Sequence, residues 1–299
     1  MPKIATNGVD LHYQCLGKGE PVVLVHGLAA NLAFWYPGIA SALAQHYKVI
    51  VFDLRGHGRS SIPPSGYGRQ HLVEDLRGLL SHLNLTQVHL VGHSLGARTV
   101  TCFASTYSEQ VATLTIADTR FQCLQPGQMK LKDWPYWSTW KEKMKTMGAT
   151  LPDDDAVMDF RMLMELDRVY NDLSNNNPQK ANKLSLKSRK LGTRGRARWQ
   201  ELIEKTTITE EFDQGDQVSP AELAALPMPA CAIYGEYSHC LPTYEQLQDI
   251  IPNCSGVIIP DAGHFHPVIK PQNFVTAVEQ FLIKHPISSN VTSIPKSAP

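Results

Sequence analysis

Short apolar runs alternate with longer stretches of helical periodicity along most of the 299-residue chain. Each run is four to six residues long and rich in β-branched residues, which is typical of a strand buried on both faces. The expected strands occupy residues 21–27, 47–53, 87–94, 111–118, 230–236 and 256–264. The expected helices lie near residues 33–46, 70–83, 95–108, 243–250 and 271–285. This alternation predicts an α/β fold in which helices flank a mostly parallel sheet.

The opening residues follow a different pattern. Apolar and polar positions alternate up to about Pro21, around the turn signals Asn7-Gly8 and Gly17-Lys18-Gly19. Alternation punctuated by such turns is typical of a β-hairpin. We therefore expect an antiparallel hairpin at one edge of the sheet.

The alternation of short apolar runs and helical stretches stops between Thr119 and about Gly215. This segment has no comparable β-branched run, and it holds six of the eight methionines and four of the five tryptophans. Their helix-like spacing predicts a helical cap inserted between the sixth and seventh strands. The expected organisation is a core of residues 1–119 and 216–285, a cap insertion of residues 120–215, and a disordered tail of residues 286–299.

Charge and cysteine usage narrow the class of protein. The 28 Lys and Arg balance the 28 Asp and Glu, which argues against a nucleic-acid or membrane-surface partner. The six cysteines show no CxxC or metal-ligand spacing, which favours buried thiols in a reducing compartment. The start of the chain lacks a signal-peptide pattern and no apolar run approaches ~18 residues, so the sequence predicts a soluble, cytoplasmic protein.

The most informative motif is QVHLVGHSLGA, in which an apolar run leads through G-x-S-x-G directly into a helical pattern. A serine on such a tight strand-to-helix turn is held in a strained conformation with its hydroxyl exposed. Gly92 and Gly96 relieve the crowding on either side of Ser94. The pattern predicts that Ser94 is a catalytic nucleophile.

A serine nucleophile needs N–H donors for the oxyanion that it creates. The Leu95 N–H, directly after the nucleophile, is one expected donor. The Leu28 N–H, presented by the loop after the first parallel strand, is the other. His26 in this loop is expected to bond to the backbone.

The nucleophile also needs a base, and His264 is the predicted one because it follows the last strand at the same sheet edge as Ser94. His266 is the nearest rival and is expected to point at the insertion. His57 and His93 lie in turns and are interpreted as structural.

Four motifs together resemble the α/β-hydrolase superfamily: HG at 26–27, FDLRGHGRS at 52–60, GHSLG at 92–96 and PDAGH at 260–264. The resemblance covers roughly residues 3–285 and implies a capped hydrolase. Ser94 excludes relatives that use an aspartate nucleophile, such as epoxide hydrolases. The remaining classes are esterases, lactonases, thioesterases, C–C bond hydrolases and cofactor-free haloperoxidases.

The acid that should orient the base is not where the resemblance places it. In YGEYSHCLP, Ser238 occupies the usual aspartate position. Asp118 ends the strand after the nucleophile helix, which brings it to the carboxyl edge beside Ser94, as in chain-releasing thioesterases that carry the acid after the sixth strand. We assign the role to Asp118. Glu236 is the alternative, and Asp261 is expected to fix its own turn.

These residues predict a serine hydrolase that cleaves an ester or thioester of an apolar acyl substrate without a cofactor or metal. A C–C bond hydrolase of the same fold is the runner-up. A ligand receptor without turnover is the third alternative, because position 238 lacks the acid. The run Asp153-Asp154-Asp155 is interpreted as the acidic first turn of a helix and not as a metal site.

Two features of the insertion bear on the substrate. Trp134, Trp137, Trp140, Met144 and Met147 recur at helical spacing and are expected either to line an apolar pocket or to pack the cap. Residues 178–205 contain nine Lys or Arg and two Glu. This basic stretch is interpreted as a solvated helix face, or as a site for an anionic group of the substrate or an acyl carrier.

Overall fold

A computed structural model describes residues 2–36, 38–159, 161, 162, 165, 166, 169, 172, 176, 193–214 and 218–287. Within these residues the chain forms one eight-stranded sheet in the order β1-β2-β4-β3-β5-β6-β7-β8. The strands are β1 Lys3–Thr6, β2 Val9–Leu16, β3 Pro21–Val25, β4 Lys48–Phe52, β5 Val88–His93, β6 Val111–Ala117, β7 Ala230–Gly235 and β8 Cys254–Ile259. The strands β3 to β8 are mutually parallel, which confirms the predicted α/β sheet.

The N-terminal hairpin is also confirmed. Strands β1 and β2 pair antiparallel, and β2 pairs antiparallel with β4 at the edge of the parallel part. Asn7 and Gly8 both have positive φ, 46° and 76°. This is the geometry of a tight hairpin turn whose twist matches that of the strands.

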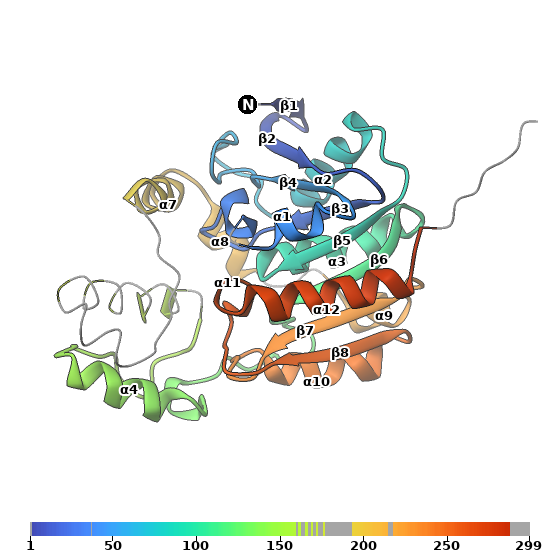
Figure 1. Cartoon of the computed structure of the whole chain (residues 1–299). Coiled ribbons are helices and arrows are strands. Elements are labelled where there is room, and N and C mark those ends of the chain that lie inside the picture. The colour runs from blue at the N-terminus through green and yellow to red at the C-terminus, as the bar shows by residue number, and fades with distance from the viewer. Residues whose placement is uncertain are drawn as a thin grey trace, which may run out of the picture.

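Helices cover both faces of the sheet (Figure 1). They are η1 Leu32–Trp35, α1 Ala40–Leu43, α2 Arg69–His82, α3 Leu95–Thr106, η2 Ser108–Gln110, η3 Leu131–Asp133, α4 Trp137–Thr146, α7 Thr193–Lys205, α8 Ile208–Asp213, α9 Pro220–Ala224, α10 Leu241–Ile250, α11 His266–Ile269 and α12 Pro271–Lys284. Figure 1 shows α12 in front of the sheet and α3 and α10 behind it.

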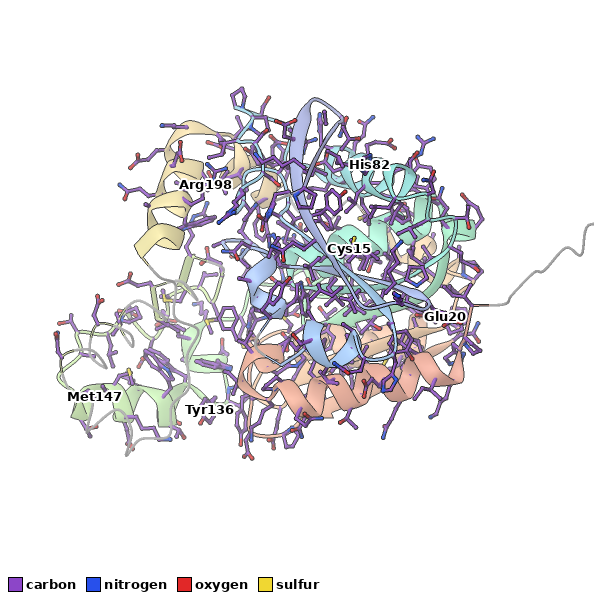
Figure 2. All side chains as sticks on the ribbon, turned by 45° about the horizontal axis from the view of Figure 1, so that its top comes forward. Cys15, Glu20, His82, Tyr136, Met147 and Arg198 are labelled. Carbon is purple, nitrogen blue, oxygen red and sulfur yellow. The ribbon has the colours of Figure 1, made fainter. Side chains whose placement is uncertain are left out.

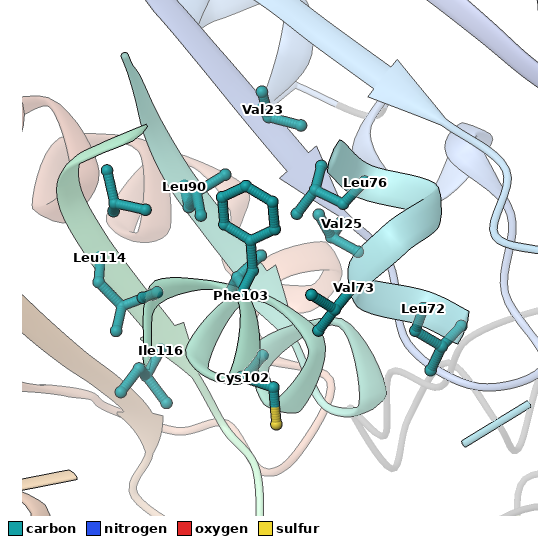
Figure 3. Close-up of a cluster of buried hydrophobic side chains, with 14 of the residues drawn as sticks. Val23, Val25, Leu72, Val73, Leu76, Leu90, Cys102, Phe103, Leu114 and Ile116 are labelled. Atoms are coloured by element: carbon teal, nitrogen blue, oxygen red, sulfur yellow. The ribbon is translucent and has the colours of Figure 1, made fainter. Parts of the chain in front are cut away.

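Successive residues of each central strand face opposite layers, which gives two cores. Val23 and Val25 of β3 pack with Phe103 of α3 in one cluster, part of which Figure 3 shows. Val22 and Leu24 pack in the other cluster, with residues of α1 and α12. Because both faces are covered by helices, the central strands are apolar at consecutive positions.

Two predicted elements differ from the structure. The helix expected near 33–46 is replaced by the short helices η1 and α1, and Gly38 between them has a φ of 84°, which a continuous right-handed helix does not allow. The strand expected at 256–264 ends at Ile259 as β8. Asp261, with a φ of 50°, turns the chain out of the extended conformation.

Among the described residues of the segment between β6 and β7, the helices η3, α4, α7 and α8 are joined by turns and irregular stretches, which include residues 118–130 and 147–159. Trp137, Trp140, Met144 and Met147 pack in one buried cluster within the segment. Figure 2 shows Met147 and Tyr136 on this part of the molecule. The Trp134 indole Nε1 donates to the carbonyl of Tyr237, 2.8 Å away, and so joins the segment to the loop after β7. The tryptophan and methionine stripe therefore packs the insertion itself.

The acidic run after Pro152 is a turn, so the prediction of a helical first turn is wrong. Its carboxylates pair with lysines instead: Asp154 with Lys141 and Asp155 with Lys130 and Lys132. These ion pairs hold the side chains of the turn at the surface.

Several predictions fall on residues outside the described ranges. They are the tail from 288 onward, the boundary near 216, and residues 178–192 of the basic stretch. Among the described residues, no helix has the length and apolar character needed to cross a membrane.

Candidate active site

Ser94 lies between the end of β5 and the first residue of α3. Its φ of 55° and ψ of −119° are strained for a residue with a side chain, as the G-x-S-x-G context predicts. The flanking glycines are needed for steric reasons. A Cβ on Gly92 would lie 2.4 Å from the Gly96 carbonyl oxygen, and a Cβ on Gly96 would lie 2.1 Å from that of Val25. Only glycine therefore allows the helix to start this close to the strands.

The loop after β3 lies directly against the serine. A Cβ on Gly27 would lie 2.9 Å from the Cβ of Ser94, so glycine permits this approach. His26 fixes the loop: its Nδ1 donates to the Gly27 carbonyl, 2.8 Å away, and its Nε2 accepts from the Leu54 N–H. The expectation that His26 bonds to the backbone is confirmed.

The two predicted oxyanion donors flank this contact. Leu28 follows Gly27 in the loop, and Leu95 is the first residue of α3, where a helix leaves its N–H groups without intrahelical acceptors. Within the described part of the chain, no hydrogen bond is found for either N–H. Their role as oxyanion donors stays a prediction.

Asp118 follows β6 and is fully buried. The ladder between β5 and β6 places it beside the serine, since the Ser94 N–H donates to the carbonyl of Ala117, 3.0 Å away. Asp118 Oδ1 lies 2.9 Å from His264 Nδ1. A carboxylate and an imidazole thus meet at the carboxyl edge of the sheet, next to Ser94.

Three further groups surround this carboxylate. The Ser238 hydroxyl donates to Oδ1 at 2.5 Å, and the Gly235 N–H donates to Oδ2 at 2.9 Å. The Nε2 atom of His266 lies 3.9 Å from Oδ2. Burial alone would raise the pKa of Asp118, but the hydrogen bond and positive charge of His264 outweigh it and hold the pKa well below its usual range. The carboxylate is therefore ionised at neutral pH.

His264 has most of its ring covered, with 9% of the side chain exposed. Because Nδ1 bonds to Asp118, Nε2 is the ring nitrogen left for proton transfer. His93, next to Ser94 in the chain, donates from Nε2 to the main-chain oxygen of His264, 2.8 Å away. This bond ties the base candidate to the serine turn and agrees with the structural interpretation of His93.

The other histidines have structural contacts. His57 bonds through Nδ1 to the Arg55 carbonyl at 2.8 Å, as expected of a residue that fixes a turn. His266 does not point at the insertion, so that expectation is wrong. It is fully buried against the sheet and donates from Nε2 to the Ile233 carbonyl, 3.1 Å away.

The alternative acids lie elsewhere. Glu236 accepts from the Asp261 N–H at 2.8 Å, so its carboxylate fixes the turn after β8. The Asp261 side chain is 73% exposed and lies 3.5 Å from Lys270. Among the described carboxylates that we considered, Asp118 alone bonds to His264.

Sequence reasoning missed what Ser238 does. The sequence pattern identifies Ser238 only as the residue at the usual aspartate position. The serine at position 238 is itself a signal. A side chain at the usual acid position is expected to point toward His264, and a serine hydroxyl there can donate a hydrogen bond to a carboxylate that has moved to another strand.

A cavity of about 320 Å³ is lined in part by residues 29–33 of the loop after β3. Its lining includes His12, Asp53, Arg59, Arg198 and Trp199. Arg198, labelled in Figure 2, reaches from α7 to the carbonyl of Ser60. The described end of the basic stretch therefore contacts the core.

The family model of the alpha/beta hydrolase fold matches residues 20–271, and the chain belongs to this family. The chain is 27% identical to a soluble epoxide hydrolase of Corynebacterium sp. over 294 residues, which covers 92% of this chain and 94% of that protein. It is 24% identical over 284 residues to a 2-hydroxy-6-oxo-6-(2'-aminophenyl)hexa-2,4-dienoic acid hydrolase of Metapseudomonas resinovorans, covering 93% and 89% of the two chains.

Other matches are partial or structural. The chain is 38% identical to the non-heme chloroperoxidase CPO-A1 of Kitasatospora aureofaciens over 97 residues, but this match spans only 35% of that protein. Among solved structures, a thermophilic esterase from Thermogutta terrifontis superposes with a TM-score of 0.66 at 25% identity, covering 95% of this chain and 99% of the esterase. The fold and the family support a hydrolase.

Proposed function

We propose that the protein is a serine hydrolase that cleaves an ester or thioester through an acyl-enzyme intermediate. The observation that carries the proposal is the bond between Asp118 Oδ1 and His264 Nδ1, 2.9 Å long, beside the strained Ser94. In this mechanism His264 Nε2 takes the proton of Ser94, whose Oγ attacks the acyl carbonyl. Asp118 holds the imidazole tautomer and stabilises the imidazolium.

The remaining steps use the same residues. The N–H groups of Leu28 and Leu95 bind the oxyanion of the tetrahedral intermediate. His264 returns its proton to the leaving alcohol or thiol, and then activates a water that releases the acid. The inserted segment acts as the cap that covers an apolar acyl group.

Active-site labelling tests this proposal. The wild-type protein is expected to react with a fluorophosphonate probe and to hydrolyse p-nitrophenyl esters. Ser94→Ala is expected to lose both activities and keep its circular dichroism spectrum. Ser41→Ala, an exposed serine on α1, is the matched control and should behave as the wild type. Ester turnover by the Ser94→Ala variant would sink the serine mechanism, and no labelling of the wild type would favour a ligand receptor without turnover.

A second candidate is hydrolysis of a C–C bond by the same residues. It is favoured by the similarity to the dienoic acid hydrolase of Metapseudomonas resinovorans, which extends over most of both chains. An ester and a β-diketone with the same acyl group separate the two candidates. Turnover of the diketone with none of the ester would replace the first proposal by the second.

A further inference from the structure

The loop after β7 places two side chains that can bind a metal ion close to His264. His239 and Cys240 follow Ser238 in this loop. The Cys240 Sγ lies 3.4 Å from His239 Nε2, and the rings of His239 and His264 are 5.3 Å apart between centroids. One ligand atom from each of the three residues lies within 4.8 Å of the other two.

These separations are close to those of a tetrahedral metal site. Zinc binds cysteine sulfur at about 2.3 Å and histidine nitrogen at about 2.0–2.1 Å, so a sulfur and a nitrogen on one ion lie roughly 3.5 Å apart. The Cys240 and His239 atoms already have this spacing, at 3.4 Å. A shift of roughly 1 Å that brings the loop with His239 and Cys240 toward His264 would complete three ligands around one ion and leave the bond between His264 and Asp118 in place.

The surroundings of the three residues resemble the outer shell of a metal site. A metal-binding histidine commonly donates its other ring N–H to a carboxylate, which orients the ring. His264 has this bond through Nδ1 to Asp118, which leaves Nε2 as the ligand atom. The loop is fixed as well. The Cys240 N–H donates to Ser238 Oγ at 3.0 Å, and Gln125 donates to the His239 carbonyl at 3.0 Å.

The protonation states set what binding requires. A metal ligand must be a neutral imidazole or a thiolate. Cys240 is a free, buried cysteine, so its thiol must lose a proton when it binds a metal. Binding of a divalent cation therefore releases one proton from the thiol to solvent as the sulfur–metal bond forms.

We propose that His239, Cys240 and His264 form a binding site for a borderline-soft divalent cation, Zn²⁺ being the best fit, that reversibly inhibits the enzyme. A set of two imidazoles and one thiolate suits Zn²⁺ and does not suit Mg²⁺ or Ca²⁺. The bound cation takes the Nε2 lone pair of His264. Inhibition rests on the hydrolase function proposed above, because His264 then cannot accept the serine proton. Binding does not rest on that function.

Binding is tested without reference to turnover. Co²⁺ is titrated as a spectroscopic substitute into wild-type protein and into Ser94→Ala, and both are expected to show the thiolate-to-cobalt charge-transfer band at one equivalent. Zn²⁺ should displace Co²⁺, and Mg²⁺ should not. Loss of an outer-shell partner costs about 10–100-fold in metal affinity, so loss of the ligand in Cys240→Ser should cost at least as much and remove the band.

The controls separate this site from other thiols and imidazoles. Cys254→Ser and His46→Gln change residues remote from the cluster and should bind Co²⁺ as the wild type does. His239→Gln is a second ligand variant, should Cys240→Ser fail the folding check by circular dichroism. Each variant is then assayed for Zn²⁺ inhibition of ester turnover relative to its own zinc-free rate, with reversal by a chelator.

The outcomes distinguish the two proposals. Without a thiolate–cobalt band in the wild type, or with equal Zn²⁺ inhibition of wild type and Cys240→Ser, the metal site is overturned. If the band is present and no ester or diketone is turned over, the metal site stands and the proposed function fails.

Discussion

The hydroxyl of Ser238 donates to Oδ1 of Asp118, 2.5 Å away, and this is the same oxygen that bonds to His264. The residue at the position where this fold family usually has its acid is therefore a hydrogen-bond donor to the carboxylate of Asp118. A buried carboxylate needs such donors, since an unpaired buried charge is costly. Ser238 and the Gly235 N–H together fix both oxygens of Asp118.

Asp118→Asn is expected to lower kcat by ~10³–10⁴, the scale for loss of charge in a triad acid, because the imidazolium loses its counter-charge. Esterase kinetics and circular dichroism check the variant. Glu236→Gln is the matched control, since Glu236 bonds to the Asp261 N–H instead, and it should cost less than about tenfold, or ~1.4 kcal/mol. If kcat falls strongly in Glu236→Gln and not in Asp118→Asn, the assignment of Asp118 as the acid is wrong.

Ser238→Ala is expected to reduce stability by about 1.5–3 kcal/mol, the contribution of a hydrogen bond to a charged group. It should reduce kcat much less than Asp118→Asn does, because the carboxylate and its bond to His264 remain. Urea unfolding and steady-state kinetics measure the two effects. A loss of kcat equal to that of Asp118→Asn would show that the hydroxyl does more than hold the carboxylate.

The acid is expected to be transferable to position 238. In the double variant Asp118→Asn, Ser238→Asp, the new carboxylate starts from a side chain already within hydrogen-bond distance of position 118. We expect kcat to recover at least about tenfold over Asp118→Asn alone, a non-additive result for residues in contact. Ser238→Asp alone places two carboxylates together and should lower the melting temperature. A double variant no faster than Asp118→Asn would mean that the new carboxylate does not reach His264.

Arg198→Glu is expected to raise KM for an anionic ester about five- to tenfold, or ~1–1.4 kcal/mol, and to leave KM for a neutral ester unchanged. Arg198 lines the 320 Å³ cavity and lies in the described part of the basic stretch, residues 193–205. The effect should shrink at high salt. Lys205→Glu, on the same helix with 67% of the side chain exposed, is the control. Equal KM changes for both esters would favour the interpretation of the basic stretch as a solvated helix face.

Glu222→Gln is expected to reduce stability at neutral pH but not in acid. The hydrogen bond from Arg69, 2.6 Å away, lowers the pKa of Glu222 to about 2 against the opposing effect of burial. A lowered pKa stabilises the fold above the unfolded value of about 4.3, and this contribution is lost as the pH falls toward 2. Because the ion pair between Arg69 and Glu222 is partly exposed, solvent screens it, and we expect a loss of unfolding free energy of about 1 kcal/mol.

Urea unfolding of the wild type and Glu222→Gln at pH 7 and pH 2.5 measures this. The difference in unfolding free energy should shrink at the lower pH. Glu245→Gln, an exposed residue on α10, should show no difference at either pH. An equal deficit of Glu222→Gln at both pH values would contradict the ionic origin.

The sequence by itself determined the order of the elements and the residues around the serine turn. Apolar runs, Asn-Gly turns and the glycines around Ser94 act through local sterics and burial, so their pattern is visible in the chain. The break at Gly38 was not predicted, because it depends on a backbone conformation that competes with a favourable apolar pattern.

Only the tertiary structure decided what surrounds Asp118. His264, Ser238 and Gly235 lie 117 to 146 positions away along the chain and reach the carboxylate because β7 lies between β6 and β8 in the sheet. The pairing of β7 with β8 brings Cys240 close to His264. A sequence pattern gives the position of each residue along its strand, whereas the choice of hydrogen-bond partner depends on which strands lie side by side and on which way each side chain turns.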